Sequence, residues 1–221
     1  MFKIPNRQVS VIGILDLGFV WDLGFGNWDF SGMKIGILGG TFNPIHIGHL
    51  ILAEEVREKL GLDKVIFVPT YLPPHKEALG IAEAQARLNM VKLAIEGNHY
   101  FSVSDKEIKR NGRSYTIDTV REFKKEYPQD ELFFLIGSDL LKYLEEWKDL
   151  SEVAKLVKFI VGTRPGYPLE DIPSYIDTVA IRAVDVSGFQ IRERIKQSRS
   201  FRYLVPEAVY KYITENKLYE D

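Results

Sequence analysis

The stretch MKIGILGGTFNPIHIGHL, residues 33–50, decides the fold of this chain. Residues 34–38 form a short apolar run that predicts a buried strand. Gly39 and Gly40 end this strand, and adjacent glycines let backbone N–H groups approach a ligand where side chains would block them. Asn43-Pro44 then predicts a turn and the start of a helix. This order is typical of the first unit of an open α/β sheet, in which ligands bind at the carboxyl ends of the strands.

Two histidines lie in the first turn of the predicted helix. His46 and His49 share one helix face, which continues as an apolar stripe through Ala53, Val56 and Leu60. A helix start beside the first strand favours anions. Taken alone, the two imidazoles also fit a structural pair that caps the helix, or a zinc pair, although the chain has no cysteine and no third ligand at metal-site spacing. Their place after the double glycine favours nucleotide binding.

Composition narrows the class of protein. The chain has 221 residues, a formal net charge of -2 and no cysteine. This length suits one α/β domain with an ample core, and the charge argues against a general nucleic-acid surface. The lack of cysteine excludes disulfides and cysteine chemistry and suits a cytoplasmic protein. We expect no nucleic acid and no membrane among its partners.

Residues 1–32 do not share the pattern of the rest. They repeat the tetrapeptide DLGF and are rich in glycine, tryptophan and phenylalanine. Lys3 and Arg7 precede an apolar run, as in a secretory signal, but two aspartates interrupt it and no small-residue cleavage site follows. We therefore predict that the domain spans residues 33–221 and that residues 1–32 are an extension, from a misassigned start or an artificial addition. The alternative is that their apolar residues cover a surface patch.

From residue 33 onward, apolar runs alternate with helical patterns. Predicted strands lie at residues 34–38, 64–69, 100–103, 132–136, 158–163 and 179–184. Predicted helices run from the histidines to residue 60, then over 82–96, 114–127, from 139 through 147, 190–196 and 206–215. This alternation predicts an α/β fold with a doubly wound, mostly parallel Rossmann-like sheet, helices on both faces and a small helical C-terminal part. One edge of the sheet would then gather the strand ends at Gly39, Pro69, Gly137 and Thr163.

The segment GGTFNPIHIGHL, with its H-x-G-H core, resembles the nucleotidyltransferase superfamily that activates small phosphate-bearing molecules with a nucleoside triphosphate. It is neither the dinucleotide-binding G-x-G-x-x-G nor a Walker A loop, because no G-K-[ST] follows. Later segments resemble, in this order, the bacterial nicotinate-nucleotide adenylyltransferases: PTYLPPHK (69–76), SYTIDT (114–119), IGSD (136–139) with Trp147, GTRPG (162–166) and RYLVP (202–206). The resemblance covers residue 33 to the C-terminus. It implies the reaction of ATP with nicotinate mononucleotide to give deamido-NAD and pyrophosphate, in NAD biosynthesis.

The resemblance also implies a set of site residues. The mononucleotide phosphate is already an anion that attacks the α-phosphorus of ATP, so positioning and charge stabilisation dominate and no base is required. The catalytic donors to the ATP phosphates would be His46 and His49, with Mg²⁺ bridging triphosphate oxygens. Implied ATP-binding residues are Gly39, Gly40, Thr41, Phe42, Arg164, Ser187 and Arg192. Implied substrate-binding residues are His75, Lys76, Thr116, Gly137, Asp139, Tyr143 and Trp147.

Several of these residues have a plain structural alternative. His75 and Lys76 lie on a proline-rich loop and also fit two solvated surface side chains. Asp139 suits a ribose hydroxyl but also the N-cap of the next helix. Tyr143 and Trp147 would lie one turn apart on one helix face, beside the pyridine ring, although aromatic pairs at this spacing more often belong to the core.

The chain departs from the family pattern in two places. Asn43 stands where the family often has Asp, which removes a charge but keeps the turn chemistry. Gly188-Phe189 stand within SGFQIR (187–192), where the family favours S-S-T-x-I-R, so one hydroxyl is lost. Two other functions stay open: a sister enzyme, such as phosphopantetheine adenylyltransferase or a cytidylyltransferase, and a non-catalytic nucleotide sensor. The sequence also leaves open a homo-oligomer and the use of nicotinamide mononucleotide.

Overall fold

A computed structural model describes residues 32–74, 80–163, 172–182 and 184–220. Its strands form one six-stranded sheet in the order β3-β2-β1-β4-β5-β6, with every neighbouring pair parallel. They are β1 (Lys34–Gly40), β2 (Lys64–Pro69), β3 (Phe101–Val103), β4 (Glu131–Gly137), β5 (Lys158–Thr163) and β6 (Ile176–Ala180). The strand order reverses between β1 and β4, which is where ligands bind in such sheets. The predicted doubly wound fold is confirmed.

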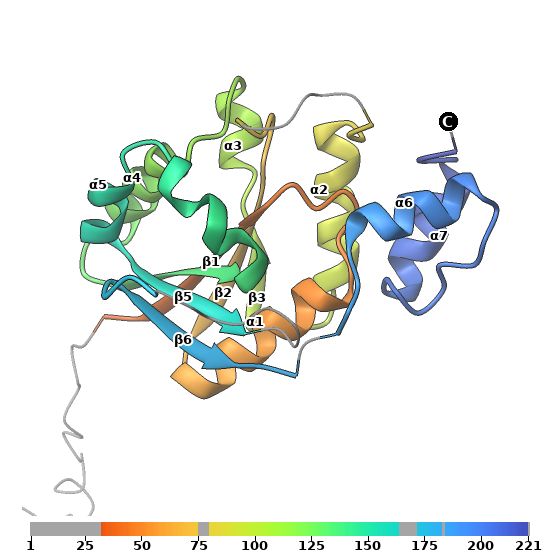
Figure 1. Cartoon of the computed structure of the whole chain (residues 1–221). Coiled ribbons are helices and arrows are strands. Elements are labelled where there is room, and N and C mark those ends of the chain that lie inside the picture. Colours follow the sequence, from red (N-terminus) through yellow and green to blue (C-terminus); the bar gives the residue numbers. More distant parts are fainter. Residues whose placement is uncertain (1–31, 75–79, 164–171, 183, 221) are drawn as a thin grey trace, which may run out of the picture. The chain divides into compact units, whose positions relative to one another are not determined.

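Two hydrophobic clusters cover the two faces of the sheet. Alternate residues of β1 divide between them, with Ile35 and Ile37 in one cluster and Leu38 in the other. The Leu38 side is covered by α1 (Ile47–Leu60) and α2 (Ala84–Ile95), and its cluster extends to α6 (Gly188–Lys196) and α7 (Glu207–Glu215). The opposite side is covered by α4 (Thr116–Glu126), the 3-10 helix η1 (Ser138–Glu146) and α5 (Leu150–Leu156). Figure 1 shows these two helical layers.

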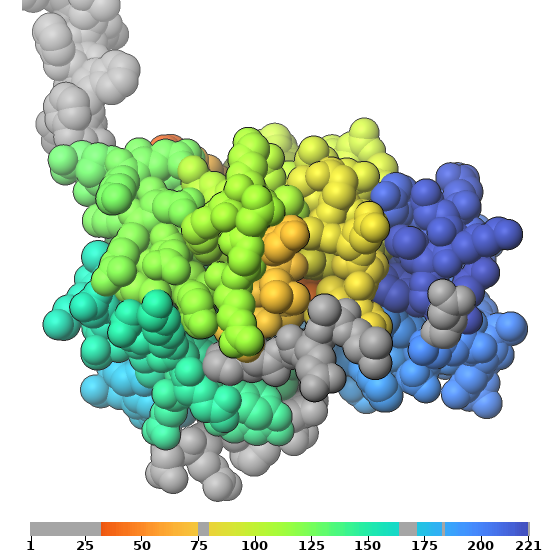
Figure 2. Space-filling model, turned by 90° about the horizontal axis from the view of Figure 1, so that it is seen from above, coloured from red at the N-terminus to blue at the C-terminus, as the bar shows by residue number. Residues whose placement is uncertain are grey.

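The C-terminal helices dock beside α2 rather than over the centre of the sheet. Figure 2 shows the yellow α2 meeting the dark blue C-terminal segment, and the Asn89 side-chain amide donates to the Tyr212 hydroxyl over 3.2 Å. The predicted small helical C-terminal part is therefore confirmed. Among the described residues, no helix is long and apolar enough to cross a membrane.

The structure corrects two sequence expectations and adds two short helices. The strand predicted at 179–184 lies at Ile176–Ala180 instead, because it pairs with β5 and ends where β5 ends at Thr163. The segment up to residue 147 forms a 3-10 helix that ends at Glu146. Two short helices, α3 (Lys106–Arg110) and α5, were not predicted, since five and seven residues are too few to show a helical period.

Candidate active site

The turn after β1 brings backbone groups to the carboxyl edge of the sheet. Phe42 has a φ of 47° and a buried ring, which packs edge-on against His49 with centroids 5.0 Å apart. A Cβ at Gly40 would lie 3.1 Å from this ring, so a side chain there would press on it. Phe42 can therefore face a ligand only through its backbone, while its side chain anchors the turn.

The two histidines form a stacked pair at the start of α1. Their ring centroids are 3.7 Å apart at an interplanar angle of 27°. The backbone N–H of His46 donates to Nδ1 of His49 over 3.2 Å, so in the neutral ring the proton of His49 is on Nε2. His46 is the N-cap residue, and Ala53 and Val56 continue the same face into the core. The capping alternative is therefore realised, and Nε2 carries the ring proton of neutral His49.

Arg87 of α2 joins the segments that follow β1 and β2. Its guanidinium is 1% exposed and donates to four backbone carbonyls, at distances of 2.7 to 2.8 Å. These carbonyls belong to Thr41, Thr70, Tyr71 and Ala82. Burial lowers the pKa of Arg87. This residue was not predicted from the sequence, although an arginine in register with the buried Val91 and Ile95 of α2 was the available signal.

Asn43 explains one departure from the family pattern. Its side-chain amide donates to the Gly80 carbonyl over 2.9 Å and accepts from the Ala82 N–H over 3.0 Å. An ionised Asp could accept from Ala82 but could not donate to Gly80. The exchange therefore serves a contact between the β1–α1 turn and the segment before α2, which no local pattern reveals.

The N-terminus of α6 lies against the same turn. A Cβ at Gly188 would lie 2.7 Å from the Asn43 carbonyl oxygen, so glycine is required by this close approach. Arg192 donates to that oxygen over 2.7 Å and holds its charge beside the start of α1. Ser187 caps α6 by accepting from Gln190 N over 3.2 Å. Phe189 is 63% exposed, which agrees with leaving it out of the predicted site.

Gly137 and Asp139 lie where β4 ends and η1 begins. Gly137 is the N-cap residue of η1, so the N-cap alternative for Asp139 is wrong. A Cβ at Gly137 would lie 2.5 Å from Oδ1 of Asp139, and glycine therefore lets the Asp139 carboxylate lie next to the strand end. The placement of Asp139 at the strand end is as predicted, and its role toward a ribose stays a prediction.

Tyr143 and Trp147 do not share a helix face. A 3-10 helix has three residues per turn, so residues four apart point in different directions. Tyr143 is 46% exposed, whereas Trp147 packs edge-on against Phe134 and Phe159, with centroids 5.6 and 6.0 Å away. The predicted pair on one helix face is therefore wrong, because Trp147 packs at the edge of the core.

A second helix start lies near the end of β2. Thr116 is the first residue of α4 and Tyr115 is its N-cap, so the helix begins two residues after its predicted start at residue 114. Ser114 ties this start to the chain after β2, because its N–H donates to the Leu72 carbonyl and its hydroxyl accepts from the Tyr71 N–H, both over 2.9 Å. The predicted residues His75, Lys76 and Arg164 lie outside the described residues.

Comparisons with known proteins show the family of this chain and agree with its fold. The cytidylyltransferase-like family model matches residues 37–194. The nicotinate-nucleotide adenylyltransferase of Bacillus subtilis is 44% identical over 187 residues, which cover 85% of this chain and 98% of that protein. The Plasmodium falciparum nicotinic acid mononucleotide adenylyltransferase complexed with NaAD has a TM-score of 0.72 at 17% identity, over 85% of this chain and 98% of that one. Its complex with APC gives 0.70 at 18% identity, with the same coverage. At these identities the two solved structures show a shared fold.

Proposed function

Because the chain belongs to the cytidylyltransferase-like family and, within it, to the nicotinate-nucleotide adenylyltransferases, we propose that it transfers the adenylyl group of ATP to nicotinate mononucleotide. The reaction would take place where the strand order reverses, between β1 and β4. The products are deamido-NAD and pyrophosphate, a step of NAD biosynthesis. The observation that carries the proposal is the stacked pair of His46 and His49 at the start of α1, directly after the double glycine of β1. The proposal places the reaction in the cytoplasm and requires no nucleic acid or membrane.

For this reaction the protein has to position the two substrates and stabilise the charge on the leaving phosphates. A phosphate oxygen of the mononucleotide forms a bond to the α-phosphorus of ATP, while the bond to the bridging oxygen breaks and its electron pair leaves with pyrophosphate. Because the attacking oxygen is already ionised, no side chain has to take a proton. The Nε2–H of His49, the imidazole of His46 and the positive start of α1 suit the charge that develops on the leaving phosphates.

We propose that ATP enters as its Mg²⁺ complex. The described residues contain no group of three or more His, Asp or Glu side chains able to hold a metal ion, so triphosphate oxygens and water would supply most of its ligands. The ion would neutralise phosphate charge. Arg192, held at the Asn43 carbonyl, adds a fixed positive charge from the protein.

The start of α4 is our proposed site for the pyridine carboxylate. The first N–H groups of a helix have no partner within it and favour an anion. A carboxamide brings its own donors and leaves such N–H groups unpaired, which is costly in a dry pocket. We therefore propose a preference for nicotinate over nicotinamide mononucleotide.

The test compares kcat/KM for the two mononucleotides at fixed ATP and Mg²⁺, with pyrophosphate release as the signal. Losing charge-assisted bonds costs about 1.5–3 kcal/mol, so we expect a ten- to more than hundredfold preference for the acid. Equal values would contradict acid specificity. An absence of turnover with both substrates would favour the nucleotide sensor.

A further inference from the structure

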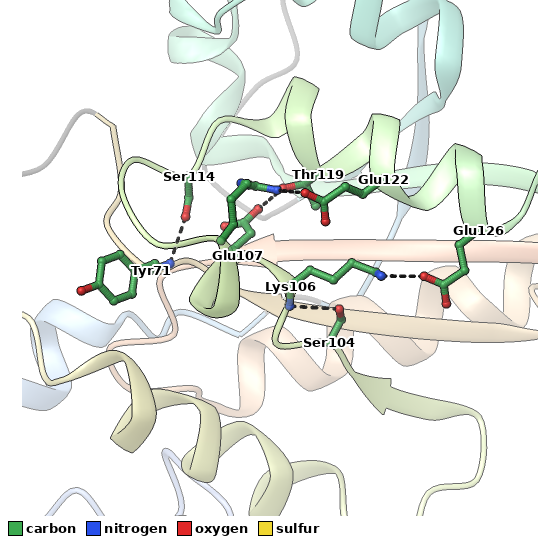
Figure 3. Close-up of polar contacts among 9 residues, drawn as sticks. Tyr71, Ser104, Lys106, Glu107, Ser114, Thr119, Glu122 and Glu126 are labelled. Carbon is green, nitrogen blue, oxygen red and sulfur yellow. Dashed lines mark hydrogen bonds and ion pairs between the residues drawn. The ribbon is translucent and has the colours of Figure 1, made fainter.

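A buried carboxyl group lies beside the start of α4 and has no part in the proposed chemistry. Glu107 of α3 is 5% exposed, and its Oε1 accepts a hydrogen bond from the Thr119 hydroxyl. The Ser114 hydroxyl lies beside the same carboxyl. Among the described residues, no donor makes a well-formed hydrogen bond to the second oxygen, Oε2. Figure 3 shows Glu107 between these two hydroxyls.

The two hydroxyls stand on either side of the residue predicted to meet the substrate. Ser114 comes directly before the N-cap Tyr115, and Thr119 is the fourth residue of α4, so one carboxyl contacts the chain before and after Thr116. Both hydroxyl residues are buried. Since Ser114 Oγ already accepts from the Tyr71 N–H, its own proton is available to Glu107.

The arrangement is costly to maintain. Burial raises the pKa of Glu107, and the nearby hydroxyls of Thr119 and Ser114 and the charge of Arg110 offset only part of this rise. An apolar side chain of the same size would avoid the cost of desolvating a carboxyl. What it could not do is hold two hydroxyls at fixed points of the backbone, since that requires an acceptor.

We propose that Glu107 is a positioning residue for substrate choice, which fixes the first turn of α4 through Ser114 and Thr119 so that its N–H groups meet the pyridine carboxylate. This inference rests on the proposed function, in which α4 receives that carboxylate. Hydrogen bonds weaken steeply as their angle falls, so a small rotation of this turn reduces the preference for the acid. Glu107 itself does not contact substrate in this scheme.

The main experiment compares Glu107→Ala with Glu107→Gln. The alanine variant loses both contacts, and we expect its ratio of kcat/KM for nicotinate over nicotinamide mononucleotide to fall by about tenfold. The fall should come from a higher KM for nicotinate mononucleotide, with the KM for ATP unchanged. The glutamine variant keeps an acceptor for Thr119 and should retain most of the preference. An equal fall in both variants, or none in Glu107→Ala, would overturn the inference.

Two further variants separate positioning from general loosening. Thr119→Val removes one hydroxyl at nearly constant shape and should lower the ratio in the same direction; it carries the test if Glu107→Ala does not fold. Lys106→Met is the matched control, because Lys106 pairs with Glu126 at the far end of α4, at 2.6 Å. Its ratio should equal that of the wild type, and a fall like that of Glu107→Ala would refute positioning. A wild type without preference would contradict the proposed function instead.

Discussion

At the start of α1 the two histidines contact each other within one turn, whereas at the start of α4 the side-chain contacts come from other segments. His46 donates to His49 three residues later in the chain. Ser114 is held by Tyr71 and Leu72 after β2, and Thr119 by Glu107 of α3. The histidine pair at the phosphate end is therefore formed by residues close in the chain, although the Ile47 N–H at the start of α1 also donates to the Leu204 carbonyl over 3.0 Å. The proposed ring end depends on distant segments and can be re-aimed through them.

Arg87 is the residue that connects the two ends, so its loss should have the largest effect. Arg87→Met leaves the carbonyls of Thr41, Thr70, Tyr71 and Ala82 without their donor. We expect the free energy of unfolding, measured in urea, to fall by about 3–5 kcal/mol.

Arg121→Met is the control for Arg87→Met, because Arg121 forms an exposed pair with Glu152. Its loss should change the free energy of unfolding by less than about 0.5 kcal/mol. If both variants are equally stable, the four carbonyls have found other donors and the two ends are not joined through Arg87.

The two histidines of the phosphate end should affect kcat and leave the choice between the two mononucleotides unchanged. Alanine at His46 or His49 should lower kcat by roughly 10²–10³, with much smaller changes in KM, because charge stabilisation in the transition state is lost. The ratio of nicotinate to nicotinamide activity should stay at the wild-type value in both variants. His99→Ala is the control, since His99 is exposed and its ring lies tilted against Tyr100 before β3. An unchanged kcat would leave the two histidines with a capping role alone.

The same contrast explains what could be predicted from sequence. The double glycine, the turn and the histidines are neighbours in the chain, so their pattern predicts both their structure and their place at the sheet edge. Glu107 and Arg87 make their contacts with segments that are distant in sequence, and no local spacing reveals those partners. In the sequence, Asn43 and Gly188 are only departures from the family pattern. In the structure, Asn43 bonds to Gly80 and Ala82, and Gly188 lies close to the Asn43 carbonyl.

The prediction that Tyr143 and Trp147 share a helix face is wrong for another reason. Their spacing of four fits an α-helix, but the chain forms a 3-10 helix there, in which Leu144 is buried and Tyr143 is exposed. Two aromatic residues at α-helical spacing therefore predict a shared helix face that the 3-10 helix does not form. The role of Trp147 toward a pyridine ring stays a prediction.

A pH experiment examines the ring end without substrate. Because burial raises the pKa of Glu107, the folded protein holds this proton to a higher pH than the unfolded chain does. The stabilising contribution is complete below the ordinary carboxyl pKa and is lost as the pH rises through the raised value. Glu107→Gln does not titrate, so it should gain stability relative to the wild type as the pH increases from acid to neutral. A constant difference in urea unfolding across this range would mean that Glu107 titrates as in the unfolded chain.

The smallest effect is expected from the segment that precedes both ends. Removing residues 1–32 and starting at Met33 should leave turnover unchanged and shift the melting temperature by less than about 2 °C. The reason is that β1 is already held at its beginning: Met33 N–H donates to Asp130 Oδ1 over 2.8 Å, and Lys34 N–H donates to Asp63 Oδ2 over 2.7 Å. A drop of many degrees would instead show that Phe19, Trp21 or Phe30 covers apolar surface of the domain, and a selective loss of the nicotinate preference would make the ring end dependent on this segment as well.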